Sequence, residues 1–212
     1  MTMSSAEKTD VTRTLDAIEA RRSVRKFDAG RTVEDDVMRR IVECGMCSPT
    51  AVNSREWHFV VVRDAATRGR LAGAVPYCRF AAEPTAVCVV VCAELAKEKA
   101  PGHWPQDCGA AVQTMLIAAA ALGVGSTWTS LHPFEDVCAS LSPSPFSVFD
   151  SQLPSPFIST LTQRAKNVGS VLGVPEGVEP FALVVFGYPP ADKPLERRPS
   201  RFDAALLHNE KW

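Results

Sequence analysis

The chain has 212 residues, of which 46% are hydrophobic and 22% are charged, and its formal net charge is −1. This length suits a single globular domain. The near-neutral charge excludes a global basic field that would hold nucleic acid or an anionic membrane surface. Any anion-binding site must therefore be local and built from a few placed arginines.

The cysteine content and the absence of long apolar runs indicate in which cellular compartment the protein is expected. Seven cysteines are present and several lie inside apolar runs, which favours reduced thiols packed like small hydrophobic side chains. The first ten residues are polar and lack the apolar core of a signal peptide. No apolar run reaches the roughly 18 residues of a membrane-spanning helix. We expect a cytoplasmic protein without a membrane segment.

Helical and strand patterns alternate along the chain. In chain order we expect a helix over 10–22, a helix over 32–46, a strand over 57–62, a helix over 64–75, a strand over 86–92, a helix over 107–122, a strand over 124–129 and a strand over 181–186. Thr32 is the expected N-cap of the second helix, with Asp35 in the capping-box position, and Asp64 is the expected N-cap of the third. Gly123 stands where a C-terminal glycine cap belongs.

Two of these segments indicate a layered fold. The strand over 86–92 (AVCVVVC) has no polar alternation, so both of its faces should be covered. The helix over 107–122 is apolar nearly all round, which indicates deep burial. Together they predict a single α+β domain, three-layered or closely related, over residues 1–212.

Two further segments do not fit the alternation. Residues 140–170 contain two Ser-Pro-rich stretches with interspersed phenylalanines and are predicted to be an insertion, either a mobile loop or a lid. Residues 191–212 form a tail that is rich in proline and arginine.

Several polar motifs could carry chemistry, and each also has a structural interpretation. Arg21, Arg22, Ser23 and Arg25 follow the first helix and could form a phosphate cradle, because guanidinium groups bind phosphate in a bidentate manner. They could equally be a solvated helix end. The loop over 48–59 is dense in donors but could be a simple turn. The glycine-rich segment over 122–130 could approach a flat ligand or serve close packing.

The order of these motifs resembles the nitroreductase family of flavoproteins. The resemblance covers the chain from about residue 15 to 212, apart from 140–170. It rests on RRSVRKF (21–27), SPTAVNSREWHFVVV (48–62), DCGAAVQTMLIAAAALGVGSTW (107–128), LGVPEGVEPFALVVFGYP (172–189) and the R…H…W ending (Arg201, His208, Trp212). It implies a three-layer α-β-α fold with a mostly antiparallel central sheet and a domain-swapped homodimer, in which residues 191–212 embrace the partner.

The resemblance also implies an FMN site whose first part comes from the N-terminal motif. Arg21, Arg22 and Ser23 would hold the FMN phosphate and ribityl chain. Arg25 would approach the pyrimidine edge of the ring, where a cation would stabilise the negative charge that reduction places at N1 and O2.

The second part of the implied site comes from the loop after the second helix. Pro49, Thr50, Asn53 and Arg55 would reach the flavin of the neighbouring subunit. Family members often carry Gln-Pro before the tryptophan, whereas this chain has Arg55-Glu56.

The third part comes from the glycine-rich segment and the tail. Trp128, Thr129 and Ser130 would lie against the ring near N5. Arg201, and more weakly Arg198, would close on the phosphate.

The implied activity is electron transfer from NADH or NADPH, through FMN, to nitro compounds, quinones or similar small acceptors in a ping-pong sequence on one shared site. No protein nucleophile, catalytic metal, nucleic acid or membrane is expected. A specialised family member such as a dehalogenase, and a flavin-binding regulatory or storage protein, are the alternatives. A branch that cleaves flavin fits less well because it carries an aspartate where Ser23 stands.

Two unrelated chemistries are also conceivable from the sequence. Cys44 and Cys47 form a CxxC motif, but it ends a helix and lacks the βαβ context of a thiol redox centre. The four histidines are not paired with cysteines at zinc-ligand spacing, so we expect no zinc site.

Overall fold

A computed structural model of the chain describes residues 14–75, 77–132 and 155–212. Its four strands form one sheet in the order β1-β2-β4-β3, with every neighbouring pair antiparallel. The strands are β1 (Trp57–Val62), β2 (Val87–Glu94), β3 (Gly125–Ser130) and β4 (Val178–Gly187). β1 matches its predicted bounds, and the others agree with prediction except at their ends.

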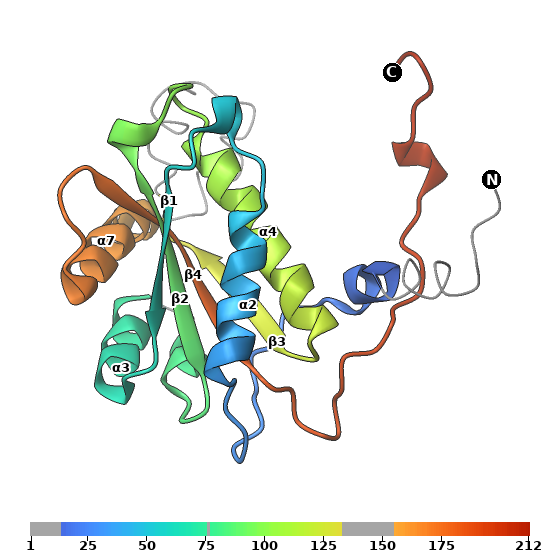
Figure 1. Cartoon of the computed structure of the whole chain (residues 1–212), viewed down its shortest axis with the longest axis horizontal. Helices are drawn as coiled ribbons and strands as arrows, with labels where there is room; N and C mark the ends of the chain where they lie inside the picture. The colour runs from blue at the N-terminus through green and yellow to red at the C-terminus, as the bar shows by residue number, and fades with distance from the viewer. Residues whose placement is uncertain (1–13, 76, 133–154) are drawn as a thin grey trace.

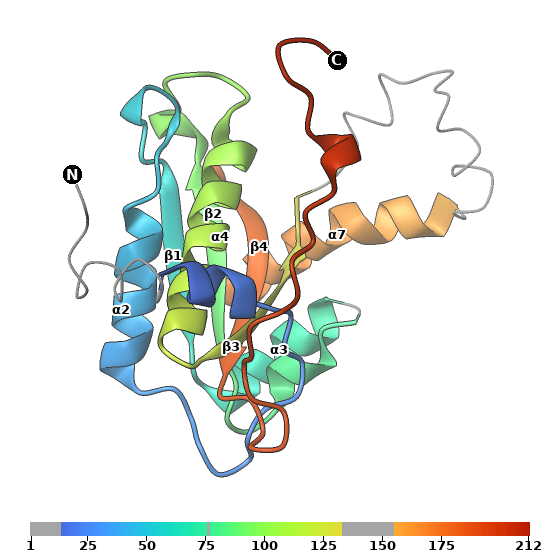
Figure 2. The ribbon, with the colours of Figure 1, turned by 90° about the vertical axis from the view of Figure 1, so that its right-hand side faces the viewer.

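Helices cover both faces of this sheet (Figure 1). They are α2 (Asp35–Met46), α3 (Ala65–Ala74), α4 (Trp104–Ala121) and α7 (Ser155–Leu172), with residues 14–20 forming a further helical segment. α2 and α4 lie together on one face, and α3 and α7 lie on the other (Figures 1 and 2). The predicted three-layer α+β architecture with an antiparallel sheet is therefore confirmed.

The central strand β2 separates two hydrophobic cores. Val87, Val89 and Val91 pack towards α2 and α4, whereas Cys88 and Val90 pack towards α3 and α7. Side chains alternate between the two faces of a strand, so an unbroken apolar run is what a strand covered on both sides requires. The prediction that both faces of this strand are covered is correct.

The start of α2 differs from the expected capping box. The helix begins at Asp35 with Glu34 at the N-cap position and without a side-chain cap. The hydroxyl of Thr32 instead donates to the backbone oxygen of Thr85, 3.3 Å away. Thr32 ties the preceding loop to the start of β2, so the prediction that it caps the helix is wrong.

The two ends of α4 show how local chemistry sets helix bounds. The helix begins at Trp104, three residues before the expected start, because a Glu98 side-chain oxygen accepts from the backbone N–H groups of His103 and Trp104. At the other end Gly123 has φ +73°, the left-handed conformation of a C-terminal glycine cap. The expected glycine cap is thus confirmed.

The segment predicted to be an insertion over 140–170 contains a helix. Residues 133–154 lie outside the described part of the chain, but 155–170 belong to α7, and Ala165 and Val168 are buried in the core beside α3. The prolines of this stretch led to the prediction of a loop, yet Pro156 stands in the first turn of α7, where proline is tolerated. For its second half, the prediction of a mobile loop or lid is wrong.

The N-terminal motif joins the sheet at the β3 edge. Ser23 forms an isolated parallel bridge with Ser126, and the Val24 N–H donates to the Ser126 carbonyl at 2.9 Å. Glycines allow this close approach: a Cβ added at Gly187 would lie 2.6 Å from the Phe27 ring. The segment that carries the predicted phosphate cradle is therefore fixed along the edge of the sheet.

Candidate functional site

The structure brings the arginines of the N-terminal motif together with those of the C-terminal tail. Burial and the nearby positive charges of Arg201, Arg22 and Arg21 lower the pKa of Arg198. These four side chains are therefore within electrostatic range of one another, although about 180 positions separate them in the sequence. Arg21, Arg22, Arg198 and Arg201 therefore lie near one another, and their binding of a phosphate stays a prediction.

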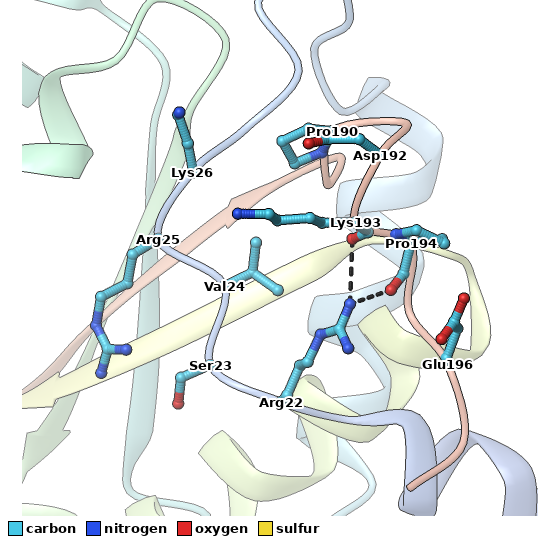
Figure 3. Close-up of a pocket in the computed structure, with 10 residues that line it drawn as sticks. All are labelled: Arg22, Ser23, Val24, Arg25, Lys26, Pro190, Asp192, Lys193, Pro194 and Glu196. Carbon is cyan, nitrogen blue, oxygen red and sulfur yellow. Dashed lines mark hydrogen bonds between the residues drawn. The ribbon is translucent and has the colours of Figure 1, made fainter.

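The tail is held beside the N-terminal motif by direct contacts. The Arg22 guanidinium donates to the backbone oxygens of Lys193, at 3.1 Å, and of Pro194 (Figure 3). Arg197 forms ion pairs with Asp16, at 3.6 Å, and with Glu19. A cavity of about 420 Å³ lies between the two segments.

The four arginines and Ser23 fit an anion of the phosphate type. No ion pair with a carboxylate in the described part of the chain neutralises Arg21, Arg198 or Arg201, whereas their neighbour Arg197 is paired. Crowded guanidinium groups repel one another and have a geometry that matches phosphate oxygens. The exposed Ser23 hydroxyl lies in the same segment. We call Arg21, Arg22, Arg198 and Arg201 the arginine cluster.

Arg25 belongs to a different group. Its side chain extends away from the tail, on the other side of the 22–26 segment (Figure 3). Its charge, together with that of Arg164, acts on the Cys78 thiol, whose pKa is raised by burial. Cys78 Sγ lies 2.9 Å from Thr129 Oγ1 on β3. The charge of Arg25 therefore acts on the same thiol that Thr129 contacts, and a ligand shared by Arg25 and Thr129 stays a prediction.

Arg164 on α7 is a member of this group that the sequence analysis missed. Its side chain is only 6% exposed, and its Nε has no hydrogen-bond partner among the described residues. A single arginine in a Ser-Pro-rich stretch carries no local signal of a site. Its relation to Arg25 depends on α7 packing against the sheet.

The side chains of the segment Trp128–Ser130 do not all face the same side of the sheet. The Trp128 ring packs against Phe181, with centroids 5.9 Å apart, on the side of the sheet covered by α4. Thr129 contacts Cys78, which belongs to the opposite core. Of the three, Thr129 is the residue that the structure places with Arg25.

The loop with Pro49, Thr50, Asn53 and Arg55 lies elsewhere. It precedes β1, at the opposite edge of the sheet from β3, where Ser23 pairs. Three strand spacings separate these edges, a distance of about 14 Å. Within one chain, the structure does not bring these four residues to the N-terminal motif.

The conformation of this loop is unusual. Val52, Asn53 and Arg55 each have φ 53°, in the left-handed region that non-glycine residues seldom adopt. Two contacts hold it: Arg55 Nε donates to Asn53 Oδ1 at 2.8 Å, and Ala51 N–H donates to Asp107 Oδ2 at 2.9 Å. A strained backbone conformation of this kind persists only where surrounding contacts hold it in place.

A buried carboxyl group lies at the end of the same loop. Glu56 has no exposed surface, and neither of its carboxyl oxygens has a hydrogen-bond donor in the described part of the chain. Burial, and then Asp107 and Glu98, raise the pKa of Glu56. A protonated Glu56 could donate to Asp107. The sequence analysis missed this residue because a glutamate in a polar loop is usually solvated.

Cys44 lies in the last turn of α2, and Cys47 follows the helix directly. Cys47 Sγ donates to the backbone oxygen of Glu43 at 3.3 Å, and no disulfide links it to Cys44. Within residues 14–75, 77–132 and 155–212, no group of three or more His, Cys, Asp or Glu side chains is placed to hold a metal ion. None of the helices found in those ranges is long and apolar enough to span a membrane.

Known proteins that are similar to this chain belong to one family. The model of the nitroreductase family matches residues 18–85 and 78–145. The chain is 34% identical to the "putative NADH dehydrogenase/NAD(P)H nitroreductase" of Methanothermobacter thermautotrophicus, over 93% of this chain and 87% of that protein. A solved "putative NADH oxidase" from Clostridium acetobutylicum superimposes with a TM-score of 0.75 at 26% identity, covering 93% of this chain and all of that one.

A further solved structure contains a bound flavin. It is a "putative nitroreductase in complex with FMN" from Desulfovibrio desulfuricans, with a TM-score of 0.67 and 25% identity, covering 94% of this chain and 97% of that one. The similarity to this structure, the match to the family model and the relatives of similar length all agree with the observed fold. The chain belongs to the nitroreductase family.

Proposed function

We propose that this protein is an FMN-dependent NAD(P)H oxidoreductase that reduces nitro compounds, quinones or similar small acceptors in a ping-pong sequence. The observation that carries the proposal is the arginine cluster, in which guanidinium groups from both ends of the chain lie near one another and form no ion pair with a carboxylate among the described residues. When bound, FMN would supply the electron-transfer chemistry between NAD(P)H and the acceptor.

The chain's own residues would bind and orient the cofactor. Arg21, Arg22, Arg198 and Arg201, with Ser23, would hold the phosphate through charge-assisted hydrogen bonds. Arg25 would lie at the pyrimidine edge, where its fixed positive charge favours the reduced form without rearrangement. Names of relatives that mention NAD(P)H, and the relative with bound FMN, support this assignment.

We further propose that the active protein is a homodimer. Several apolar side chains of one chain remain exposed, including Leu15 and Ile18 of the N-terminal helical segment and Leu122 after α4. In the tail Phe202 is 71% exposed and Trp212 fully so. Large apolar side chains that one chain leaves exposed could be buried against a partner subunit. A partner would also supply the Pro49–Arg55 loop that one chain leaves distant from Arg25.

The decisive experiment is the absorption spectrum of the purified protein with FMN, followed by anaerobic NADH or NADPH. We expect flavin bands that bleach with the donor and return when a nitroaromatic or a quinone is added. Light scattering on the same sample should give twice the chain mass.

Other outcomes would redirect the assignment. A protein that takes up no FMN would overturn the proposal. One that binds FMN but does not turn over with either donor would be a flavin-binding storage or regulatory protein. A monomer that holds FMN with full affinity would overturn the dimeric site.

A further inference from the structure

Two acids are buried in the described part of the chain, and they differ in their partners. Asp107, in the first turn of α4, is 8% exposed, and its Oδ2 accepts from the backbone N–H of Ala51 at 2.9 Å. Glu56 has no exposed surface, and neither of its carboxyl oxygens meets a donor among the described residues. A buried carboxylate without a donor is strongly unfavourable, whereas a protonated carboxyl group carries a donor of its own.

The carboxylate of Asp107 is the acceptor for that donor. The two side chains are within hydrogen-bonding reach of each other, and burial, followed by this hydrogen bond, raises the pKa of Glu56. Two carboxyl groups so close together are not both ionised, because their charges repel each other. Asp107 accepts from a backbone N–H, which favours its ionised form, so the shared proton belongs to Glu56.

The other groups that face Glu56 do not offer it a positive charge. Asp107 and Cys108 act on it from α4, and Glu98 acts on it from the segment that precedes this helix. Burial raises the pKa of Cys108, so its thiol is neutral. Lys99, in the same segment as Glu98, donates instead to a backbone oxygen of the 50–55 loop, 3.3 Å away. Protonation is therefore the means by which Glu56 is accommodated.

Asp107 links this pair of acids to the strained loop. Its bond to Ala51 fixes the residue directly before Val52, the first of the three non-glycine residues with φ 53°. Ser54 Oγ donates to the Ala51 carbonyl oxygen at 2.7 Å, so both polar groups of the Ala51 backbone are held. Left-handed backbone at such residues persists only under contacts of this kind. A second negative charge beside Asp107 would weaken one of them.

We infer that protonated Glu56 is a positioning residue, which donates to Asp107 and thereby holds the Pro49–Arg55 loop in the shape that completes the flavin site of the partner subunit. The inference rests on the proposed function, because it requires a dimer in which this loop reaches FMN. Glu56 does not touch the cofactor in this arrangement. It acts through Asp107 and the backbone of Ala51.

The direction of the pH effect follows from the shared proton. While Glu56 is protonated, it donates to the Asp107 carboxylate and the loop is held. As the pH rises through the raised pKa, both carboxyl groups become ionised, they repel each other, and the bond from Ala51 N–H to Asp107 weakens. Affinity for FMN should then fall. By linkage, bound FMN should raise the pKa of Glu56 further.

The first test compares FMN binding by the wild type and by Glu56→Gln across a pH series, measured by quenching of FMN fluorescence. The amide of Gln donates to Asp107 at every pH and has almost the same shape. We expect the dissociation constant of the wild type, divided by that of the variant, to rise about tenfold from the acid to the alkaline side of the raised pKa. Titration of FMN itself cancels in this ratio.

The second test follows the loop directly in the FMN-free protein. Amide hydrogen exchange of Ala51 should lose protection above the raised pKa in the wild type and keep it in Glu56→Gln. Gly30 is the matched control, because its N–H donates to a carboxylate oxygen of Asp28 at 2.8 Å, away from Glu56. Its protection should be the same in both proteins at every pH.

Three results would overturn the inference. Constant protection of Ala51 in the wild type across the pH range would do so without any variant. A pH step in FMN affinity that Glu56→Gln retains would assign the step to another group. Protection of Ala51 that follows Glu56 while FMN affinity does not would show that the loop is held as inferred but lies outside the flavin site.

Failure of the proposed function is visible separately. It would appear as a wild-type protein that binds no FMN at any pH, whatever the exchange of Ala51 shows.

Discussion

The two edges of the sheet carry ionisable groups of opposite type that have no partner of opposite charge within the described chain: arginines at the β3 edge and a glutamic acid at the β1 edge. At the β3 edge, the arginine cluster forms no ion pair with a carboxylate in the described part of the chain, whereas the neighbouring Arg197 is paired. At the β1 edge, Glu56 is a buried acid without a donor, next to Asp107. An arginine keeps its positive charge, so the β3 edge presents positive charge that a bound anion would neutralise. A carboxyl group can be neutralised by a proton, so the β1 edge requires none.

This contrast helps to distinguish charged residues that bind a ligand from ionisable residues that only support the fold. An unpaired arginine is evidence for a missing anion, whereas an unpaired glutamate is first evidence for protonation. The buried carboxyl of Glu56 would therefore serve the shape of the loop, while Pro49, Thr50, Asn53 and Arg55 would remain available to the site of a partner subunit. The following predictions test this division.

The largest effect is expected at the arginine cluster. Arg21→Gln should weaken FMN binding by about ten- to a hundredfold, because one charge-assisted contact to phosphate contributes roughly 1.5–3 kcal/mol. Fluorescence quenching of FMN on titration with the protein measures the dissociation constant. Arg197→Gln is the control, because Arg197 lies in the same tail but is paired with Asp16 and Glu19. Equal losses in the two variants would show that general charge, rather than the cluster, binds the cofactor.

The second effect concerns the packing that holds the N-terminal motif against β4. Gly187→Ala would place a Cβ 2.6 Å from the Phe27 ring and should lower the free energy of unfolding by about 1–3 kcal/mol. In Gly69→Ala the new Cβ on α3 meets no heavy atom within 4 Å, so that variant should be stabilised by about 0.5–1 kcal/mol. Denaturant unfolding measures both values. A neutral Gly187→Ala would mean that the 21–27 segment is not fixed at this edge.

The sequence predicted the sheet far better than it predicted these charges. Periodicity and β-branched content located β1 and identified β2 as covered on both faces, because these properties depend on neighbours along the chain. α7 was missed because proline and serine, which favour turns, also occur in the first turn of helices. Arg164 and Glu56 could not be recognised, because their significance lies in what surrounds them after folding. The residues of the arginine cluster could be named as candidates from the sequence, because they belong to motifs that follow one another in a recognisable order.

The smallest effect is expected at Glu56 and depends on pH. Its pKa is raised above the ordinary 4.5, so the folded state binds this proton more tightly than the unfolded state. The stabilising contribution is fully present below pH 4.5 and is lost as the pH rises through the raised pKa. Glu56→Gln keeps a neutral donor towards Asp107 and should therefore be more stable than the wild type, by about 1 kcal/mol, only at the higher pH values.

Glu94 provides the control of opposite sign for that measurement. Hydrogen bonds from Lys97 and His58 lower its pKa, so its contribution is present above the ordinary pKa and is lost as the pH falls. Unfolding curves of Glu56→Gln and Glu94→Gln across a pH series should therefore both depart from the wild type at the higher pH values, Glu56→Gln towards greater stability and Glu94→Gln towards lower stability. If Glu56→Gln ran parallel to the wild type at every pH, Glu56 would be ionised in the folded protein. The buried Glu56 carboxylate would then require a cationic partner, and the β1 edge would be as uncompensated as the arginine cluster is.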